Sequence, residues 1–553
     1  MTAVIEPQWI AKMYQGKTGR DHLGLGSVSS DQILPVLSPT INVLTIHPRY
    51  HSFYTFLLDE FWRRNRPRSR NAWVHFYRPR EFIFSVGANL CDQPEHGDMR
   101  NIVGGQKTQP LAARRAATYN TSTDYIDSEL GGYGLYYRSV LVGLGLIYPG
   151  GPGFPYPIDV PTEKGKEVAA AFRRGVQDTA YYRDYFEQDD TEISIGVIEA
   201  YIRRACLCQL QRPEAPDRRL LLDTFLHGGG NENAAARRAT FRLLLDIADQ
   251  TNGYAIDQDN FRQLLYYRAT EAGAAYRPAE ALIDTYRRWR LYQAREYYGF
   301  ALNALWCYLC EWGLLQHGDV RPVSLAQLWA DLDTALDFRQ LATWLRLPAP
   351  ALRATSDFQA LLDWLVSLVE SDEVSFDVAC GLGSPLHEHR LCVLARDNRS
   401  EPEVMVAGMI ALLGLIYLRF GRPDLWIRPE WEISRMGADG RLSLDGFVKP
   451  LRQRLQAGPF SIRDCARWLF DDYVILQHQL VAARKLPDNT YRFQREGERL
   501  RFFVHENPLA FMDARFDALS TTIHELGLCG KFSVPAHPLT PEGRRLLHEG
   551  NTA

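Results

Sequence analysis

The distribution of apolar and polar positions divides the chain into helical and β-favouring stretches. From Asp178 to about Asp424, leucine, alanine and tryptophan recur at helical spacing, as in residues 325–345 and 358–369. Proline-bearing turns separate these stretches. We find no fixed repeat period, so the pattern predicts an α-helical array or bundle. Two shorter runs in the first part of the chain, 73–77 and 81–86, favour β-structure.

A second pattern occurs once near each end of the chain. In the first copy, an apolar helix over about 136–144 stops at Gly145, which tolerates the left-handed conformation that ends helices. A short apolar strand follows, and the Gly- and Pro-rich stretch 149–157 can continue neither helix nor strand, so it must project as a loop. The chain then returns to Thr162, a good N-cap residue for a closing helix.

The second copy repeats this order with a shorter loop. An apolar helix over about 516–526 stops at Gly527, and a polar stretch leads to Thr540 and Pro541, which suit the N-cap and first turn of a helix. This order resembles the winged helix-turn-helix superfamily, whose members commonly carry a phrase like the Leu-Thr-Pro-Glu-Gly-Arg of 539–544. The likeness covers roughly 60 residues at each end.

The resemblance implies modules that dock a helix in the DNA major groove and place the hairpin loop on the backbone or minor groove. On that reading the first recognition helix carries Tyr136, Tyr137 and Arg138, and the second carries Thr521, Thr522 and His524. Phosphate contacts would come from Lys164, Lys166, Lys531 and Arg544. The same modules also serve as packing or protein-contact units, because a fold does not fix a function.

Three regions follow from these patterns. Residues 1–176 form an α+β domain that ends in the first winged-helix-like module, 177–425 form the helical domain, and 426–553 end in the second module. Within the last region we expect a helix over about 462–484 and a hairpin with Gly497 at its turn. The predicted fold is therefore mainly α and multidomain, with a helical central array flanked by α+β modules.

Composition and charge agree with a folded cytoplasmic protein. The 553 residues are 46% apolar and 23% charged, near the usual values for globular domains. Lys plus Arg number 63 and Asp plus Glu 66, so there is no global attraction to nucleic acid and any basic surface must be local. The nine cysteines are scattered in a chain too large to need disulfides, which favours a reducing compartment.

We expect neither export nor membrane insertion. The first 18 residues contain no apolar run long enough for a signal peptide. The most apolar run, 404–418, is shorter than the roughly 20 residues that span a bilayer, and we expect it to be a buried helix.

One segment has the composition of a nucleic-acid-binding surface. Its arginines supply forked contacts to phosphate or guanine, and the aromatic residues among them can stack on unpaired bases. The arginines are Arg63, Arg64, Arg66, Arg68, Arg70, Arg78 and Arg80. Alternatively, Phe53, Phe56, Leu57 and Trp62 form the core face of a helix whose solvent side and following loop are rich in arginine. The segment 286–290 offers a second such cluster, which we expect to be a solvated helix face.

Candidate metal and catalytic motifs do not assemble into a known site. Cys307 and Cys310 lie in an apolar helix, and the group Cys380, His387, His389 and Cys392 does not match a zinc spacing. The turn 227–231 lacks a nucleophile elbow, and the 16–18 segment lacks the first glycine of a phosphate loop. The acidic cluster 187–192, with Glu187, Asp189, Asp190 and Glu192, is expected to lie at the start of a helix, where the helix dipole stabilises negative charge. We predict no metal, no cofactor and no enzymatic activity.

The opening of the chain resembles large uncharacterised bacterial proteins associated with anti-phage defence islands. The resemblance rests on about 40 residues, including 24–27, 37–39, 45–50 and 53–58. Together these observations predict a non-enzymatic DNA-binding or nucleic-acid-sensing subunit of a bacterial system, with duplex DNA and other subunits as partners. The alternative is a protein-interaction scaffold of a multi-subunit complex that does not touch nucleic acid.

Overall fold

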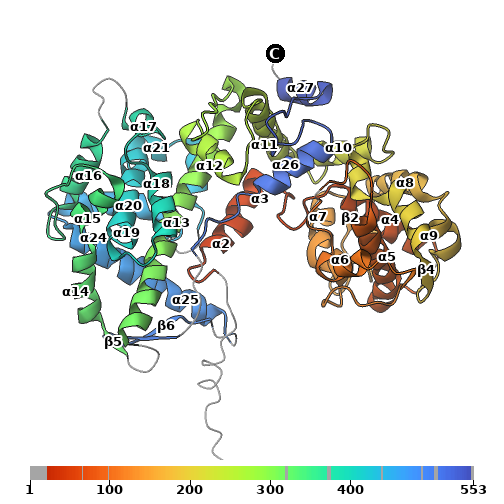
Figure 1. The fold of residues 1–553 in the computed structure, drawn as a ribbon, viewed down its shortest axis with the longest axis horizontal. Helices are drawn as coiled ribbons and strands as arrows, with labels where there is room; N and C mark the ends of the chain where they lie inside the picture. The colour runs from red at the N-terminus through yellow and green to blue at the C-terminus, as the bar shows by residue number, and fades with distance from the viewer. Residues whose placement is uncertain are drawn as a thin grey trace, which may run out of the picture. The chain divides into compact units, whose positions relative to one another are not determined.

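A computed structural model describes residues 21–549, except 65, 98, 318–321, 370–374, 438–439, 487, 489 and 504–508. The fold is mainly α-helical with small antiparallel sheets, as predicted (Figure 1). The chain forms two compact units that each combine distant segments. Unit 1 contains residues 1–34, 262–273 and 286–512, and unit 2 contains 35–261, 274–285 and 513–553. Residues 1–18, considered above for a signal peptide and a phosphate loop, lie outside the described residues.

Unit 1 is built around the apolar helix α20 (Ala407–Phe420), which is buried on nearly all sides. The helices that surround it are α15 (Phe338–Leu345), α16 (Phe358–Ser367), α17 (Phe376–Ala379), α18 (Glu388–Asp397) and α19 (Pro402–Met405). In the described part of the chain, Pro402–Phe420 is the one helical stretch apolar and long enough to cross a bilayer, and 83% of its most apolar window is buried. Such burial is typical of the core helix of a soluble protein, as the sequence predicts for 404–418.

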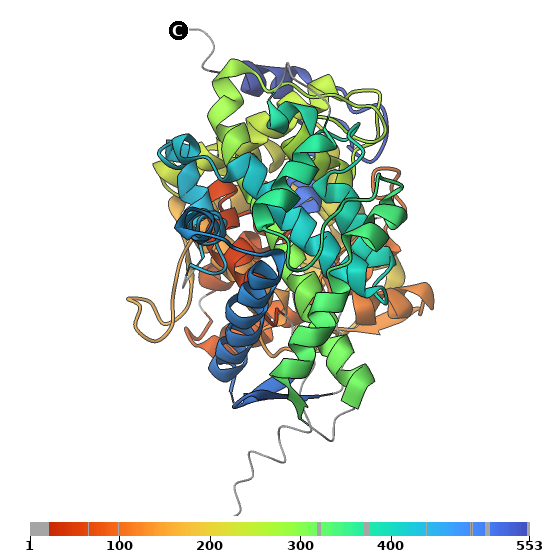
Figure 2. The ribbon, with the colours of Figure 1, turned by 90° about the vertical axis from the view of Figure 1, so that its left-hand side faces the viewer.

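The remaining elements of unit 1 include the long helix α13 (Ile283–His317) and a three-stranded antiparallel sheet in the order β5-β7-β6 (Figure 2). Gly497 turns the hairpin between β6 and β7 with φ 63°, as predicted. The other bounds in unit 1 are α2 (Leu25–Val28), η1 (Ser29–Ile33), β5 (Val323–Ser324), α14 (Leu325–Ala335), α21 (Pro423–Trp426), η6 (Pro429–Trp431), α22 (Glu432–Arg435), α23 (Asp445–Ala457), α24 (Ile462–Trp468), η7 (Leu469–Ile475), α25 (Leu476–Arg484), β6 (Phe493–Glu496) and β7 (Arg499–Phe502). Two further helices, α3 (Leu34–Leu37) and α12 (Gln258–Tyr267), contain residues of both units. The helical elements α24, η7 and α25 confirm the helix expected over 462–484.

Unit 2 packs around α4 (Arg49–Arg63), whose aromatic residues meet those of α5 (Arg70–Leu90) and α8 (Glu163–Val176). The rings of Phe53 and Phe84, for example, stack at 4.1 Å. The other elements are α6 (Gly105–Ala113), β1 (Thr118–Asn120), η2 (Tyr133–Tyr137), α7 (Arg138–Gly143), β2 (Ile147–Tyr148), β3 (Val160–Pro161), η3 (Tyr181–Tyr185), β4 (Glu192–Ser194), α9 (Ile195–Ala205), η4 (Leu207–Gln211), α10 (Arg218–His227), α11 (Asn231–Gln250), η5 (Glu280–Leu282), α26 (Phe516–Glu525) and α27 (Pro541–His548).

Two sequence expectations in unit 2 are wrong. The β-favouring runs 73–77 and 81–86 lie inside α5, which begins at a Ser69 side-chain cap on the Ala72 amide. Burial against other helices decides the conformation there, because β-propensity mainly measures how well a side chain packs on its neighbours. The acidic cluster 187–192 does not start a helix. It follows η3 and ends at Glu192, the first residue of β4, and α9 begins later, at Ile195.

The first predicted hairpin unit forms in the expected order, from η2 and α7 through β2 and β3 to α8. Gly145 has φ 73°, and the amide of Leu146 returns to the Leu141 carbonyl at 2.9 Å to end the helix. The Thr162 hydroxyl accepts from the Gly165 amide at 3.0 Å and donates to the Gly145 carbonyl at 2.8 Å. One threonine thus caps α8 and also fastens it to the preceding helix end.

The second unit repeats these contacts in α26 and α27. Gly527 has φ 75°, and the amide of Leu528 returns to the Ile523 carbonyl at 2.9 Å. The Thr540 hydroxyl accepts from the Gly543 amide at 3.1 Å and donates to the Gly527 carbonyl at 2.8 Å. Its hairpin is reduced to a single bridge between Cys529 and Leu539.

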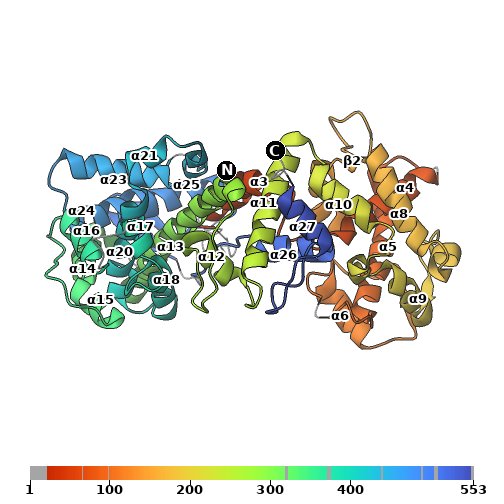
Figure 3. The ribbon, with the colours of Figure 1, turned by 90° about the horizontal axis from the view of Figure 1, so that it is seen from above.

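Both hairpin units lie within unit 2, and the second one packs against the helices of the first half of the chain. Helix α27 lies along α11, where the Arg242 guanidinium donates to the Leu547 carbonyl at 3.2 Å (Figure 3). Helix α26 contacts α11 and η4. The final segment is therefore an integral part of the unit 2 core.

Candidate functional site

The predicted arginine segment is engaged in contacts within unit 2. Arg64 and Arg66 form ion pairs with Glu187, and Arg66 and the buried Arg80 form ion pairs with Asp189. Glu187 and Asp189 belong to the acidic cluster 187–192. Arg78 pairs with Asp124 at 3.1 Å and donates to three carbonyls of 126–129. Arg68 covers the Trp62 ring, Arg63 lies 3.9 Å from Glu60, and Arg70 is exposed at the start of α5. The core-face interpretation of Phe53, Phe56 and Leu57 fits this arrangement, because all three are fully buried.

The residues predicted on the recognition helices are partly inaccessible. Tyr137 and Thr522 are buried, and Arg138 holds Asp159 with two nitrogens, its Nε and Nη2 lying 2.8 Å from the carboxylate oxygens. Tyr136 and Thr521 are half-buried, and His524 Nδ1 lies 3.0 Å from the Cys529 carbonyl oxygen.

The predicted phosphate contacts fall into two groups. Lys164 pairs with Asp223 and Lys166 with Glu163, each at 2.6 Å. Lys531 and Arg544 are exposed, and among the described residues neither forms an ion pair. A phosphate would therefore displace a carboxylate at Lys164 or Lys166 but not at Lys531 or Arg544.

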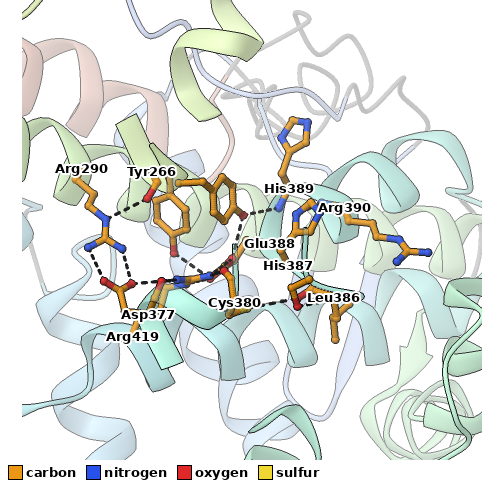
Figure 4. A network of polar contacts seen from close by, with 12 residues as sticks. Tyr266, Arg290, Asp377, Cys380, Leu386, His387, Glu388, His389, Arg390 and Arg419 are labelled. Carbon is orange, nitrogen blue, oxygen red and sulfur yellow. Dashed lines mark hydrogen bonds and ion pairs between the residues drawn. The ribbon is translucent and has the colours of Figure 1, made fainter. Parts of the chain in front are cut away.

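The cysteine and histidine motifs singled out in unit 1 remain separate. Cys307 and Cys310 are buried in α13. Cys380 donates to the Leu386 carbonyl, and His387 caps α18 by accepting from the Arg390 amide at 3.2 Å. Glu388, between His387 and His389, instead supplies a carboxylate to a buried polar network (Figure 4).

This network is centred on the ion pair between Arg419 and Glu388, both fully enclosed in unit 1. Arg419 Nε lies 2.6 Å from Glu388 Oε1, and Tyr266 and Tyr267 donate to the same carboxylate at 3.0 and 2.9 Å. Burial acts to raise the pKa of Glu388, but the Arg419 charge and these hydrogen bonds outweigh it and hold that pKa below its usual value. Arg419 is accordingly fixed as a cation.

Asp377 connects this pair to the surface. Its carboxylate accepts from Arg419 Nη1 at 3.0 Å and from Arg290 Nη1 at 2.9 Å, with Arg290 Nη2 completing a fork on the opposite side (Figure 4). Burial acts to raise the pKa of Asp377, yet the two guanidinium groups lower it to about 2. Two arginines therefore share one carboxylate at this position.

These arginines belong to a pocket of about 280 Å³ in unit 1. Its cations come from the end of α12, the first turns of α13, the end of α20 and the α21–η6 segment: Arg268, Arg287, Arg290, Arg419, Arg422 and Arg428. The lining contains six arginines against the two carboxylates of Asp377 and Glu430. Asp424 and Glu388 pair with lining arginines from outside the pocket.

Arg268 lies in this pocket with a strained backbone. Its φ of 62° is in the left-handed region that residues other than glycine seldom adopt. The exposed guanidinium lies over the Tyr286 ring, 5.3 Å from its centre. Strain of this kind persists where surrounding contacts fix the residue, and it is concentrated at ligand sites.

A larger pocket of about 550 Å³ lies in unit 2 against α26. There the buried Glu525 pairs with His47 Nδ1 at 2.8 Å, and Asp257 and Asp517 offset the cations Arg100 and Lys531. Burial acts to lower the pKa of His47, but Glu525 raises it above the usual value. Because its charges balance, this pocket does not favour a charged ligand as the arginine pocket does.

Comparisons with known proteins leave the chain without an assigned relative: no protein-family model, curated protein or solved structure matches it. The winged-helix and defence-island resemblances therefore rest on the sequence motifs alone.

Sequence reasoning missed most of the arginine pocket. It selected 286–290 but expected a solvated face, and it did not connect that helix with Arg419, Arg422 and Arg428. A usable signal was present, because an apolar helix that ends in Arg-Phe-Gly-Arg places cations where the helix dipole favours them. The convergence of α12, α13 and α20 required the tertiary fold.

Proposed function

We propose that the protein is a non-enzymatic, nucleic-acid-binding subunit whose arginine pocket takes a phosphate group and part of the attached nucleoside. The observation that carries this proposal is the excess of arginine over carboxylate in the pocket lining. Guanidinium groups bind phosphate through paired N–H donors, and a concave surface of one charge sign concentrates its field on the ligand.

The arginines of the pocket differ in how firmly internal contacts hold them. Arg290 lies over the rings of Tyr266 and Phe420, at 5.7 and 5.6 Å from their centres, and its fork is held by Asp377. Arg287, Arg422 and Arg428 are more exposed, with 43%, 64% and 42% of their side chains accessible. The charges of the buried Arg290 and Arg419 are matched by Asp377 and Glu388, and the more exposed arginines are placed to contact the ligand.

The size of the pocket favours an unpaired or terminal nucleotide over an intact duplex. Its volume of about 280 Å³ is near the lower end of the range for small-ligand sites. Duplex contacts, if made, would come from exposed cations such as Lys531 and Arg544, as the winged-helix resemblance implies.

Fluorescence anisotropy with labelled single-stranded and duplex DNA over a salt series tests the proposal. Replacing Arg287 and Arg422 together by alanine should weaken binding and reduce the salt slope by about one for each phosphate that these arginines neutralise. Arg396→Ala is the matched control, because Arg396 is an exposed arginine of unit 1 outside the pocket that pairs with its neighbour Asp397. Equal binding by the double variant and the control would remove the pocket from the interface.

A specific feature favours the second function, a protein-interaction scaffold. The first hairpin of unit 2 exposes the aromatic residues Tyr148, Phe154 and Tyr156, with accessible fractions of 53%, 49% and 41%. Aromatic residues are enriched in protein interfaces. If wild-type protein ignores DNA at every salt concentration, while Phe154→Ser with Tyr156→Ser abolishes assembly with co-purifying subunits, the scaffold function replaces the first.

Cytoplasmic location is part of the proposal. All nine cysteines lie in the described residues as free thiols, which suits a reducing compartment. Membership of a bacterial anti-phage system rests on the resemblance of the opening segment and stays a prediction.

A further inference from the structure

Four potential metal ligands from two distant segments converge in unit 2. Cys91 follows the end of α5, His96 lies in the next loop, and Cys206 and Cys208 flank the start of η4. Their donor atoms all lie within 4.8 Å of one another. The sequence gives only a Cys-x4-His pair and, more than a hundred residues later, a Cys-x-Cys pair, so neither half matches a familiar zinc spacing by itself.

Two distances within this cluster lie near the edges of a tetrahedral metal site. Cys91 Sγ lies 3.8 Å from Cys208 Sγ, and Cys206 Sγ lies 3.3 Å from His96 Nδ1. Bonds of about 2.3 Å to sulfur and about 2.0–2.1 Å to nitrogen give tetrahedral edges of about 3.8 and about 3.6 Å. A disulfide would instead require about 2.05 Å between the sulfurs.

We propose that Cys91, His96, Cys206 and Cys208 bind a zinc ion. Three thiolates and one imidazole are a soft, four-coordinate set typical of structural zinc sites, and four protein ligands leave no open position for a substrate. On binding, the three thiols give up their protons and His96 contributes the Nδ1 lone pair. This inference is independent of the proposed nucleic-acid function.

The surroundings hold the ligands in place from outside the cluster. Arg212 donates two hydrogen bonds to the Glu95 carboxylate, at 3.0 and 2.8 Å, and one to Gln93 Oε1 at 2.9 Å. These contacts connect the 91–96 loop to the end of η4. Gln209 Nε2 donates to Cys208 Sγ at 3.5 Å. Hydrogen bonds of this kind orient metal ligands and stabilise thiolates.

The buried half of the cluster is equally fixed. Cys206 and Cys208 are fully buried, and the Cys206 carbonyl accepts from Arg49 Nη1 at 2.5 Å, while Arg49 Nε pairs with the buried Asp217 at 3.3 Å. The ion would therefore join a surface loop to a segment fixed in the core. His96, Gly97 and Gln211 also line the 550 Å³ pocket, so the zinc would hold one of its walls.

Elemental analysis of the full chain, purified without added metal and without a metal-chelating tag, tests the site directly. We expect about one zinc per chain, and Cys206→Ser and Cys208→Ser should each lose most of it. Cys529→Ala is the matched control, since Cys529 is a buried thiol of unit 2 outside the cluster and its loss should leave zinc content unchanged.

Cobalt substitution gives a readout that does not depend on the folding of the variants. After chelation of the wild-type protein and addition of Co²⁺, tetrahedral thiolate coordination produces intense visible d–d bands and a sulfur-to-cobalt charge-transfer band. Both bands should disappear when Zn²⁺ displaces the cobalt. Wild-type protein that contains no zinc and gives no such spectrum would overturn the proposal. So would a Cys91–Cys208 disulfide found by mass spectrometry under non-reducing conditions.

Discussion

Gly165 and Gly543 occupy equivalent positions in the two hairpin units: a Cβ atom on either would lie 2.1 or 2.0 Å from the carbonyl oxygen of Leu146 or Leu528. In each case the first turn of a helix packs against the residue directly before the hairpin, which begins at Ile147 in the first unit and at the bridge residue Cys529 in the second. The shared restriction shows that the two units have the same local packing as well as the same order of elements.

Alanine at either position should therefore destabilise unit 2. The added methyl group meets backbone that cannot move away freely, and we expect a loss of about 1–3 kcal/mol in unfolding free energy. Gly196→Ala is the control, because nothing lies within 4 Å of its Cβ position near the start of α9. Urea denaturation measures all three variants, and equal stability of Gly165→Ala and the control would contradict the described packing.

Breaking the buried Arg419–Glu388 pair should be costly. Glu388→Gln leaves Arg419, of which 1% is exposed, with an incompletely compensated charge, and losses of about 3–5 kcal/mol are usual in such cases. Asp397→Asn removes the partner of Arg396 in a half-exposed pair, where we expect a change of about 0–1 kcal/mol. Guanidinium denaturation compares the two; similar values would mean that the pair does not contribute as its burial implies.

Lowering the pH should begin to destabilise the protein at pH values above the range in which its carboxylates titrate. Burial lowers the pKa of His51 and of His387 to about 4 and lowers that of His478 to about 3, against a usual 6.5. The unfolded chain takes up these protons below about pH 6.5 and the folded protein does not, so unfolding free energy falls as the pH drops from about 6.5 to about 4.

His47 acts in the opposite direction, because Glu525 favours its protonated form. Over the full pH window, His51 and His387 each contribute about 3 kcal/mol and His478 contributes about 5 kcal/mol, so the unfolding free energy should still rise with pH. Urea melts between pH 7.5 and 4.5 measure it. A His51→Phe variant, which cannot titrate, should show a shallower slope, and a flat wild-type profile would be the contrary result.

The metal proposal also predicts an effect on stability. Chelation should lower the melting temperature of unit 2 in wild-type protein and leave Cys208→Ser unaffected, because a ligand that binds only the folded state stabilises it. Gln209→Ala, which removes the hydrogen bond to Cys208 Sγ, should weaken zinc binding about 10–100-fold. Competition with a chromogenic chelator measures that affinity, and unchanged affinity would show that the amide does not support the thiolate.

Much of the fold follows from local patterns. Apolar periodicity predicted helical stretches that contain α14 to α16 and α20, and the turn chemistry of Gly145, Thr162 and Gly497 predicted two hairpins. Local propensity failed at α5, where buried aromatic residues of strand-like composition pack as a helix. Such packing depends on neighbours that propensity does not include.

The candidate sites depend on long-range contacts. Arg419 and Arg268 line the same pocket through the crossing of helices, and Cys91 reaches Cys206 across more than a hundred residues. Because arginine is abundant along the chain, the sequence does not distinguish arginines that bind internal carboxylates, such as Arg80, from arginines that line the pocket. Only the acidic partners, placed by the tertiary fold, separate these two roles.

The division of unit 2 between early and late segments has a consequence for biosynthesis. Helix α11 leaves the ribosome before most of unit 1 is translated, but α27, which covers part of α11, follows residue 512 in the chain. Until α27 is made, the nascent chain carries an uncovered apolar surface on α11. Chaperone capture of chains stalled near residue 512, and their release once α26 and α27 emerge, is the expected course of its maturation.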